Sequence, residues 1–519
     1  MSDAALLSPA GEGSPDLRGK AAAAVWIAVV LSVVVALGAT AAGVKPTAPL
    51  GVIAFVFVLV AARRQLLAWP TLVGALLVIV MLIPMRRYEL GGGLPFALEP
   101  YRALIAVTFM MWVGALLVDP EVHFRATGLE RPVILFGVAV LLSLVANPGR
   151  VSLLAGSVMK IVLLFTSFFA VLYLVAGMTE RREVLDRLIK LLVGCSVVVA
   201  VASLYEWRSG VNLFNDLHRV VPLLRFRPDF LPSTPGRGDH PRAYGSAQHA
   251  IALGAALVMV LPLCVYLWRR TGRFIWMIGG AVLVMGALAT GSRTAVVMLA
   301  VSFIMFLRYK PGPTIRMVPY LFVLLIVVQG AMPGTLGTFK SSFFPKQGLV
   351  SDEFAGSGSG TGRLQDVGPS LREWIHSPFV GQGFGTRLTS QQDDASQGFV
   401  NGRILDDQWL GSLLEIGLLG VFALIWLIVR ALRLLKDRAI ADDSDYGWLL
   451  TAIATSICAY AIGMLTFDAF SFIQVTLLFF VFLGLAAVAL RVDPDPPLAD
   501  PAPAPAPRQA AAQPLARPA

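Results

Sequence analysis

The sequence predicts an all-α, polytopic integral membrane protein with about twelve to fourteen transmembrane helices. Hydrophobic residues make up 56% of the 519 residues and charged residues only 14%, with a mean hydropathy of +0.74. A water-soluble domain does not have this composition. Apolar runs of roughly 17 to 25 residues, the length that crosses a bilayer as a helix, also recur along the whole chain.

The expected spans follow one another from near the N-terminus to near the C-terminus. We place them near residues 21–42, 48–62, 66–84, 101–118, 132–146, 153–177, 188–205, 246–268, 273–290, 294–308, 316–333, 408–430, 447–466 and 470–490. Three of these runs are short, which sets the lower limit of the range. The first run is long, has no clear cleavage site and precedes many others, so it is predicted to be a span rather than a cleaved signal.

The segments between and beyond the spans divide the chain further. Residues 1–20 and 491–519, the latter rich in alternating Pro and Ala, are predicted to be disordered cytoplasmic ends. Between them we expect a helix array over 21–333, a large loop over 334–407 and three C-terminal helices over 408–490. The three cysteines lie in apolar spans, where a thiol behaves as a small hydrophobe, so no disulfide, metal site or cofactor is predicted.

Charge predicts the orientation. With the N-terminus inside, the short cytoplasmic loops hold about twenty Lys and Arg residues and the short outer loops about five, as the positive-inside rule requires. Two long segments, 206–245 and 334–407, then face outside, and connections this long are usually functional or disordered. The net charge of +10 is therefore mainly a topology signal, and no nucleic-acid partner is predicted.

Two candidate sites carry arginine at outer helix ends. Arg242, Gln248 and His249 stand at the start of an expected helix, where free N–H groups and the helix dipole favour an anion. Alternatively, Arg242 lies at the lipid headgroups and His249 is satisfied at the helix end. Arg293 lies in the short turn 290–294, and it could instead reach toward lipid phosphate.

The large loop contains a third candidate. Arg363 follows a Gly/Ser-rich stretch and precedes Leu371, Trp374 and Ile375, whose spacing predicts a helix that ends before Pro378. Trp374 is expected in the core of a small interfacial helix rather than as a stacking platform.

Asp406 and Asp407 stand where this loop re-enters the membrane ahead of Trp409, and two adjacent carboxylates there have no packing role. They predict a surface site. Glu415, one turn further on, is expected to bond a neighbouring helix. Lys160 falls within a span, where an ionisable residue indicates function unless it extends to the interface.

In this order, the motifs resemble the bacterial O-antigen ligase and polymerase superfamily of membrane glycosyltransferases. The segments that carry the resemblance are Arg242-x-x-Gly245, Thr290-x-Ser292-Arg293, Gly362-Arg363 followed by His376-Ser377-Pro378-Phe379-x-Gly381-x-Gly383, and Asp406-Asp407-x-Trp409-Leu410 followed by Glu415-x-Gly417-Leu418-Leu419-Gly420. They cover roughly residues 240 to 425. The resemblance implies a GT-C-like fold in the inner membrane of a bacterium.

The resemblance also implies the chemistry and the partners. The substrates would be a polyprenyl-diphosphate-linked oligosaccharide and a glycan acceptor at the outer face, among membrane lipids, with a flippase and a chain-length regulator as partners. Arginine binds phosphate oxygens in pairs, so Arg242 and Arg293 would hold the diphosphate with help from Arg363. Asp406 or Asp407 would orient or deprotonate the acceptor hydroxyl.

Two departures from the family pattern affect the choice of reaction. Ligases of the family carry His-Asn where this chain has Asp406-Asp407, and the Pro-Asn after the first arginine motif is replaced by Gln248-His249. We therefore expect a polymerase, with an O-antigen-type ligase as the alternative. A transporter or flippase of the same lipid-linked glycan should have polar residues at mid-depth, and only Lys160 favours it. A scaffold would leave the outer arginines unexplained.

Overall fold

A computed structural model describes residues 68–91, 98–120, 122–232, 241–335, 337, 339, 363–387 and 405–492. The spans expected at 21–42 and 48–62, the two predicted disordered ends and the Gly/Ser-rich stretch before Arg363 lie outside these residues. The chain divides into two compact units, residues 1–75 and 76–519.

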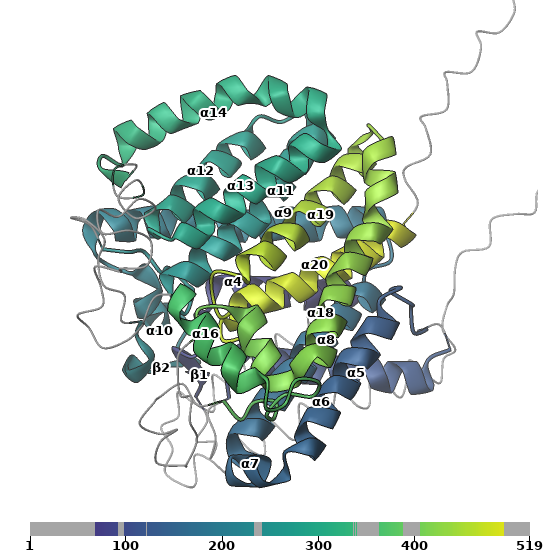
Figure 1. Ribbon diagram of the computed structural model, residues 1–519. Helices are drawn as coiled ribbons and strands as arrows, with labels where there is room; N and C mark the ends of the chain where they lie inside the picture. The colour runs from purple at the N-terminus through teal and green to yellow at the C-terminus, as the bar shows by residue number, and fades with distance from the viewer. Residues whose placement is uncertain are drawn as a thin grey trace, which may run out of the picture. The chain divides into compact units, whose positions relative to one another are not determined.

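The described part of the chain is a succession of helices, as expected for an all-α membrane protein (Figure 1). The main helices are α4 (Trp69–Leu82, whose first half belongs to the first unit), α5 (Pro100–Val118), α6 (Glu130–Ala146), α7 (Pro148–Leu153), α8 (Ala155–Met178), α9 (Arg182–Ser209), α11 (Ala250–Thr271), α12 (Ile275–Ala289), α13 (Arg293–Tyr309), α14 (Pro311–Ala331), α16 (Arg363–Trp374), α18 (Gln408–Ala441), α19 (Asp445–Gly463) and α20 (Ile473–Arg491). Within the described residues, eight helices are long and apolar enough to cross a membrane. Each span expected after residue 65 corresponds to a helix, so the predicted fold class is confirmed.

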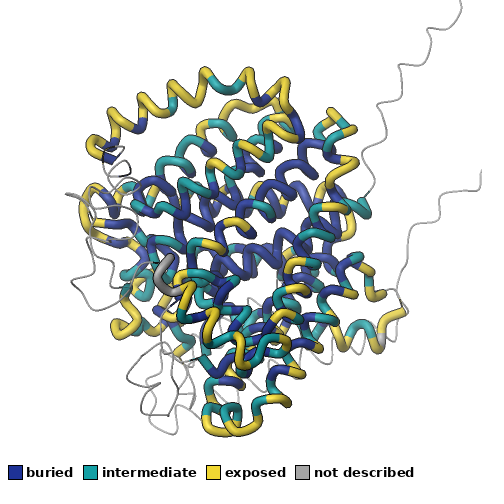
Figure 2. Tube along the Cα trace, viewed as in Figure 1, coloured by how far each residue is buried: buried dark blue, intermediate teal, exposed yellow. Residues whose placement is uncertain are grey.

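Helices α11, α19 and α20 form the buried centre of this unit (Figure 2). Small residues allow the close packing around them: a Cβ at Gly286 of α12 would lie 2.8 Å from Cβ of Ala200 in α9. A Cβ at Gly254 of α11 would likewise lie 2.9 Å from Cβ of Ala295 in α13. Close backbone approach through small residues is typical of helices packed within a membrane. In contrast, α14 is mostly exposed.

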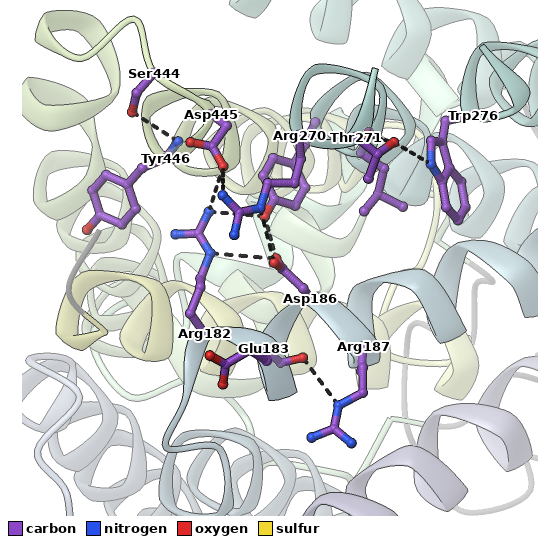
Figure 3. Close-up of polar contacts among 12 residues, drawn as sticks. Arg182, Glu183, Asp186, Arg187, Arg270, Thr271, Trp276, Ser444, Asp445 and Tyr446 are labelled. Atoms are coloured by element: carbon purple, nitrogen blue, oxygen red, sulfur yellow. Dashed lines mark hydrogen bonds and ion pairs between the residues drawn. The ribbon is translucent and has the colours of Figure 1, made fainter. Parts of the chain in front are cut away.

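At one end of the array, ion pairs join the start of α9, the end of α11 and the start of α19 (Figure 3). Arg270 Nη1 lies 2.5 Å from Asp445 Oδ2, and Arg270 Nε lies 3.3 Å from Asp186 Oδ2. The buried Arg182 completes the group, with its guanidinium 3.6 Å from each of the same two carboxylates. Ion pairing of this kind offsets the free energy that it costs to bury charges. These residues come from segments that the sequence assigns to the cytoplasmic side.

The opposite end carries short irregular elements after α4 and α9. Strands β1 (Tyr88–Leu90) and β2 (Leu224–Phe226) pair antiparallel, with Glu89 opposite Arg225. Between α9 and β2 lie η1 (Leu213–Asp216) and α10 (Leu217–Val220), and η2 (Pro228–Phe230) follows β2. Strands of three residues are too short to give a periodic sequence signal, which is why the sequence did not predict them.

Candidate functional site

The first two arginine motifs meet, although they are far apart in the sequence. The buried Arg242 donates a hydrogen bond from Nε to the carbonyl oxygen of Thr290 at 3.0 Å, and the N–H of Ala243 donates to Ala289 O at 3.2 Å. Thr290 lies three residues before Arg293, which is the first residue of α13 and is partly exposed. Ser292 between them is 1% exposed, and its hydroxyl has no hydrogen-bond partner among the described residues. The two arginines therefore share one small region.

A buried arginine that the sequence did not indicate holds this loop in place. The guanidinium of Arg87 donates to the carbonyl oxygens of Gly245 at 2.6 Å and Ala247 at 3.0 Å, and to Asn215 Oδ1 at 2.7 Å. It also lies over the ring of Tyr244. Burial lowers the pKa of Arg87 to about 10, so the side chain stays charged at neutral pH. Arg87 thus fixes the backbone immediately after Arg242.

Gln248 and His249 stabilise helix starts. The sequence predicted a span from residue 246, whereas α11 begins at Ala250. The difference arises because His249 is the N-cap: its Nδ1 accepts a hydrogen bond from the N–H of Ile251 at 3.2 Å, and its ring stacks on Phe472. The Gln248 side-chain oxygen accepts from the N–H of Ile473, the first residue of α20, at 2.7 Å. Both residues connect the Arg242 loop to the segment before α20.

The two aspartates have different environments. Asp407 is the N-cap of α18, and its Oδ1 accepts hydrogen bonds from the N–H groups of Trp409 at 2.9 Å and Leu410 at 3.2 Å. Asp406 is exposed. A capping carboxylate is partly occupied by the helix end. The two carboxylates are therefore not equivalent in the structure: Asp407 caps α18, and Asp406 is exposed.

Trp409 and its neighbour Gln408 attach this helix start to the end of α19. Trp409 Nε1 donates to Ala461 O at 3.2 Å, and the backbone N–H of Gln408 donates to Met464 O at 2.9 Å. The Gln408 side-chain oxygen accepts from the N–H of Phe470 at 2.7 Å. Trp409 thus packs the start of α18 against α19, and we retain substrate binding by Trp409 only as a prediction from its motif.

The connection between α19 and α20, residues 464–472, contacts the motif regions and was not indicated by the sequence. Thr466 donates to the hydroxyl of Thr294, the residue after Arg293, at 2.9 Å. Asp468 in this connection accepts from Ser471 Oγ at 2.5 Å and interacts electrostatically with Arg387 and Asp406. Burial raises the pKa of Asp468, while Ser471 and Arg387 oppose that shift. A carboxylate between two spans was the sequence signal that could have identified it.

The glycine-rich loop, residues 375–387 after α16, docks onto a break in α18. Gly417 interrupts the helix with φ 62° and ψ −167°, and the exposed N–H groups beyond it donate to Pro378 O at 2.9 Å and Phe379 O at 3.2 Å. A Cβ at Gly417 would lie 2.6 Å from Val380 N, and one at Gly381 would lie 2.6 Å from Ile416 N. Only glycine permits this approach of the two backbones. The third and fourth motif segments therefore form one unit.

The turn between α6 and α7 supports that unit from the other side. Ser143 Oγ donates to Glu415 O at 2.6 Å, and Asn147 Nδ2 donates to Gly381 O at 3.0 Å. Arg150 Nη1 donates to the side chain of Gln382 at 3.1 Å. The carboxylate of Glu415 interacts electrostatically with Arg150 and with Arg387. None of these three supporting residues belongs to a motif, so the sequence alone did not indicate them.

The remaining predicted residues lie in α16 and α8. Arg363 begins α16, and its side chain lies outside the described part of the structure. Trp374 packs against Leu405, Leu410 and Leu414, in agreement with its prediction as a core residue. Lys160 is exposed in the second turn of α8, next to Ile161, whose Cβ would contact a side chain at Gly385.

These features define a multi-pass membrane protein whose predicted site residues Arg242, Arg293 and Asp406 lie at or just before the starts of α11, α13 and α18. The family described as O-Antigen ligase matches residues 278–425, from α12 into α18. Over these residues the match confirms the predicted resemblance to the O-antigen ligase and polymerase superfamily, and it supports membrane glycan transfer of that general kind. It includes Arg293, Asp406 and Asp407, whereas Arg242 precedes it. No curated protein matches the chain.

Proposed function

We propose that the protein transfers glycan units from a polyprenyl diphosphate to a glycan acceptor at the outer face of the cytoplasmic membrane of a bacterium, with polymerisation favoured over ligation. One observation carries the proposal. Three hydrogen bonds join the motif regions to the segment 464–473. Thr466 bonds Thr294, which follows Arg293, and Ile473 bonds Gln248 in the Arg242 loop. Phe470 bonds Gln408, which follows the two aspartates. A cationic region and a carboxylate region are thereby held against one common segment.

The position of this region supports an outer site. Arg242 precedes α11, and Arg293 and Asp406 stand at the starts of α13 and α18. The ends of α11 and α13 carry Arg269, Arg270, Arg308 and Lys310, which the positive-inside rule assigns to the cytoplasm. A helix whose end is cytoplasmic begins outside, so the candidate site belongs outside.

The residue types suit displacement at a lipid-linked sugar. The acceptor hydroxyl would attack the anomeric carbon, form the new glycosidic bond and give its proton to Asp406. The bond from the anomeric carbon to the diphosphate oxygen would break, and polyprenyl diphosphate would leave with the bonding electrons. Arg242 and Arg293 would stabilise the charge that develops on the leaving group, with Arg363 assisting from the loop. Lys160 remains a further candidate for contact with the lipid-linked substrate.

The aspartate pair provides the test. Purified protein in vesicles is given a polyprenyl-diphosphate oligosaccharide and an acceptor, without nucleotide sugar, and the glycan products are separated by length. Asp406→Asn should retain donor binding and lose roughly 10² to 10⁴-fold in transfer rate, as expected for a positioned base. Asp407→Asn is the matched control, because asparagine caps a helix about as well as aspartate.

The outcomes separate the alternatives. Equal transfer by Asp406→Asn and wild type would contradict the role of Asp406. A ladder of lengthening products supports polymerisation, whereas a single addition to the acceptor indicates a ligase. If the wild-type protein moves the lipid-linked glycan across the vesicle membrane without forming a glycosidic bond, it is a transporter.

A further inference from the structure

Helix α16 and the turn after it have three distinct faces. The inner face contains Ser370, which is fully buried, and Trp374, which packs on the start of α18. A second face carries large apolar side chains at intervals of four residues, and helical spacing places Val367, Leu371 and Ile375 in one row. Phe379 follows them in the turn after the helix, which docks onto α18. This apolar row comprises Val367, Leu371, Ile375 and Phe379, with exposed fractions of 38%, 39%, 66% and 70%.

A polar row runs beside the apolar one. Gly368, Arg372 and His376 are exposed and follow the apolar residues by one position each. The helical turn continues past the end of α16, because the N–H of Ile375 donates to Leu371 O at 3.2 Å. The result is an amphipathic element with a cation, Arg372, beside its apolar row.

The apolar row adjoins a second exposed apolar surface, on α18. Beyond the break at Gly417, α18 exposes Leu418, Phe422 and Ile425, again at helical spacing, along a helix apolar enough to span the membrane. The N–H of Leu419 donates to Phe379 O, so the last residue of the row lies against the start of this surface. The two exposed apolar surfaces therefore meet at the docked backbones.

Exposure of such a row to water would be unfavourable, since soluble surfaces rarely present contiguous apolar patches of this kind. An arginine beside an apolar row suits the boundary between acyl chains and phosphate headgroups. Lipid is the occupant that fits both the positive charge of Arg372 and the contact between the apolar row and the exposed face of α18.

We propose that the row of Val367, Leu371, Ile375 and Phe379 lies in the lipid headgroup and acyl boundary of the bilayer, with Arg372 directed at lipid phosphate. The assignment of this contact to the outer leaflet rests on the proposed function. This contact sets the depth of the glycine-rich loop, and therefore of Arg387, which interacts with Asp468. The loop would then stand at the level at which a lipid-linked diphosphate emerges from the bilayer.

The test measures depth and needs no substrate, so its result is independent of glycan transfer. Single cysteines at positions 371 and 375, in a full-length protein whose native cysteines are replaced, receive an environment-sensitive fluorophore in phosphatidylglycerol-containing vesicles. The matched controls carry the fluorophore at positions 368 and 376 of the polar row. We expect emission shifted to shorter wavelength and quenching by lipid-attached nitroxides at 371 and 375, at a depth of roughly 5 to 10 Å.

The controls should instead be quenched by aqueous iodide. Iodide quenching at 371 and 375 equal to that at 368 and 376 would overturn the proposal. Protection of 371 and 375 from both quenchers, with disulfide cross-linking between copies at residue 375, would assign the row to a second copy of the chain and also overturn it. Lipid quenching in a protein that proves to lack transfer activity would leave the lipid contact standing and refute only the proposed function.

Discussion

The break in α18 at Gly417 gives a prediction whose size follows from the geometry. A residue with a side chain at φ 62° and ψ −167° costs of the order of 1–3 kcal/mol in backbone strain alone. The added Cβ would also lie 2.6 Å from Val380 N, which forces the docked loop to move. Gly417→Ala should therefore destabilise the protein and displace the loop that precedes Arg387.

Gly411 in the same helix is the matched control. Its added Cβ would meet only Gln408 Nε2, at 3.9 Å, so Gly411→Ala should be neutral or should gain up to about 1 kcal/mol from helix propensity. The two alanine variants should thus differ by about 1–4 kcal/mol in stability.

The assay heats each variant in detergent and measures the surviving monodisperse protein by size-exclusion chromatography. Transfer activity is then measured on the unheated protein. We expect Gly417→Ala to lose its folded fraction at a lower temperature and to lose activity even where it remains folded. Equal thermal profiles and equal activity for the two variants would refute the argument that the backbones at residues 417 and 379 must touch.

Two further predictions concern charged groups outside the spans. Arg87→Leu leaves buried carbonyls such as Gly245 O with fewer donors and should cost at least about 2 kcal/mol. The control Arg225→Leu removes an exposed arginine that lies 3.7 Å from the partly buried Glu89, and it should cost at most about 1 kcal/mol. Similar thermal stability of the two variants would contradict this. Burial raises the pKa of Asp468 in the folded protein above its unfolded value of about 3.9. The Asp468 carboxyl group therefore stabilises the folded state fully below the unfolded pKa, and this stabilisation is lost as the pH rises through the folded pKa. Asp468→Asn should flatten that decline while lowering transfer, and an unchanged slope of thermal stability between acidic and neutral pH would show that the carboxylate is not responsible.

Local sequence determined the helices and the residues at their ends. Hydropathy over a window of one span is a property of neighbouring residues, and it predicted helices such as α11 and α20 to within a few residues. The sequence also indicated that Arg242, Arg293 and Asp406 lie near helix ends, because polar residues interrupt apolar runs there. The order of the motifs was enough to predict the superfamily that the comparison supports.

The tertiary structure alone decided which of these residues come together and what each one does. Arg242 meets Thr290 across 48 residues, Gln248 meets Ile473 across 225, and Ser143 meets Glu415 across 272. Such contacts depend on how the helices pack, and helix packing is not encoded in any single window of sequence. For the same reason the sequence did not show which of the two aspartates caps α18, whereas the direction of the chain at the start of α18 makes Asp407 the cap and leaves Asp406 exposed.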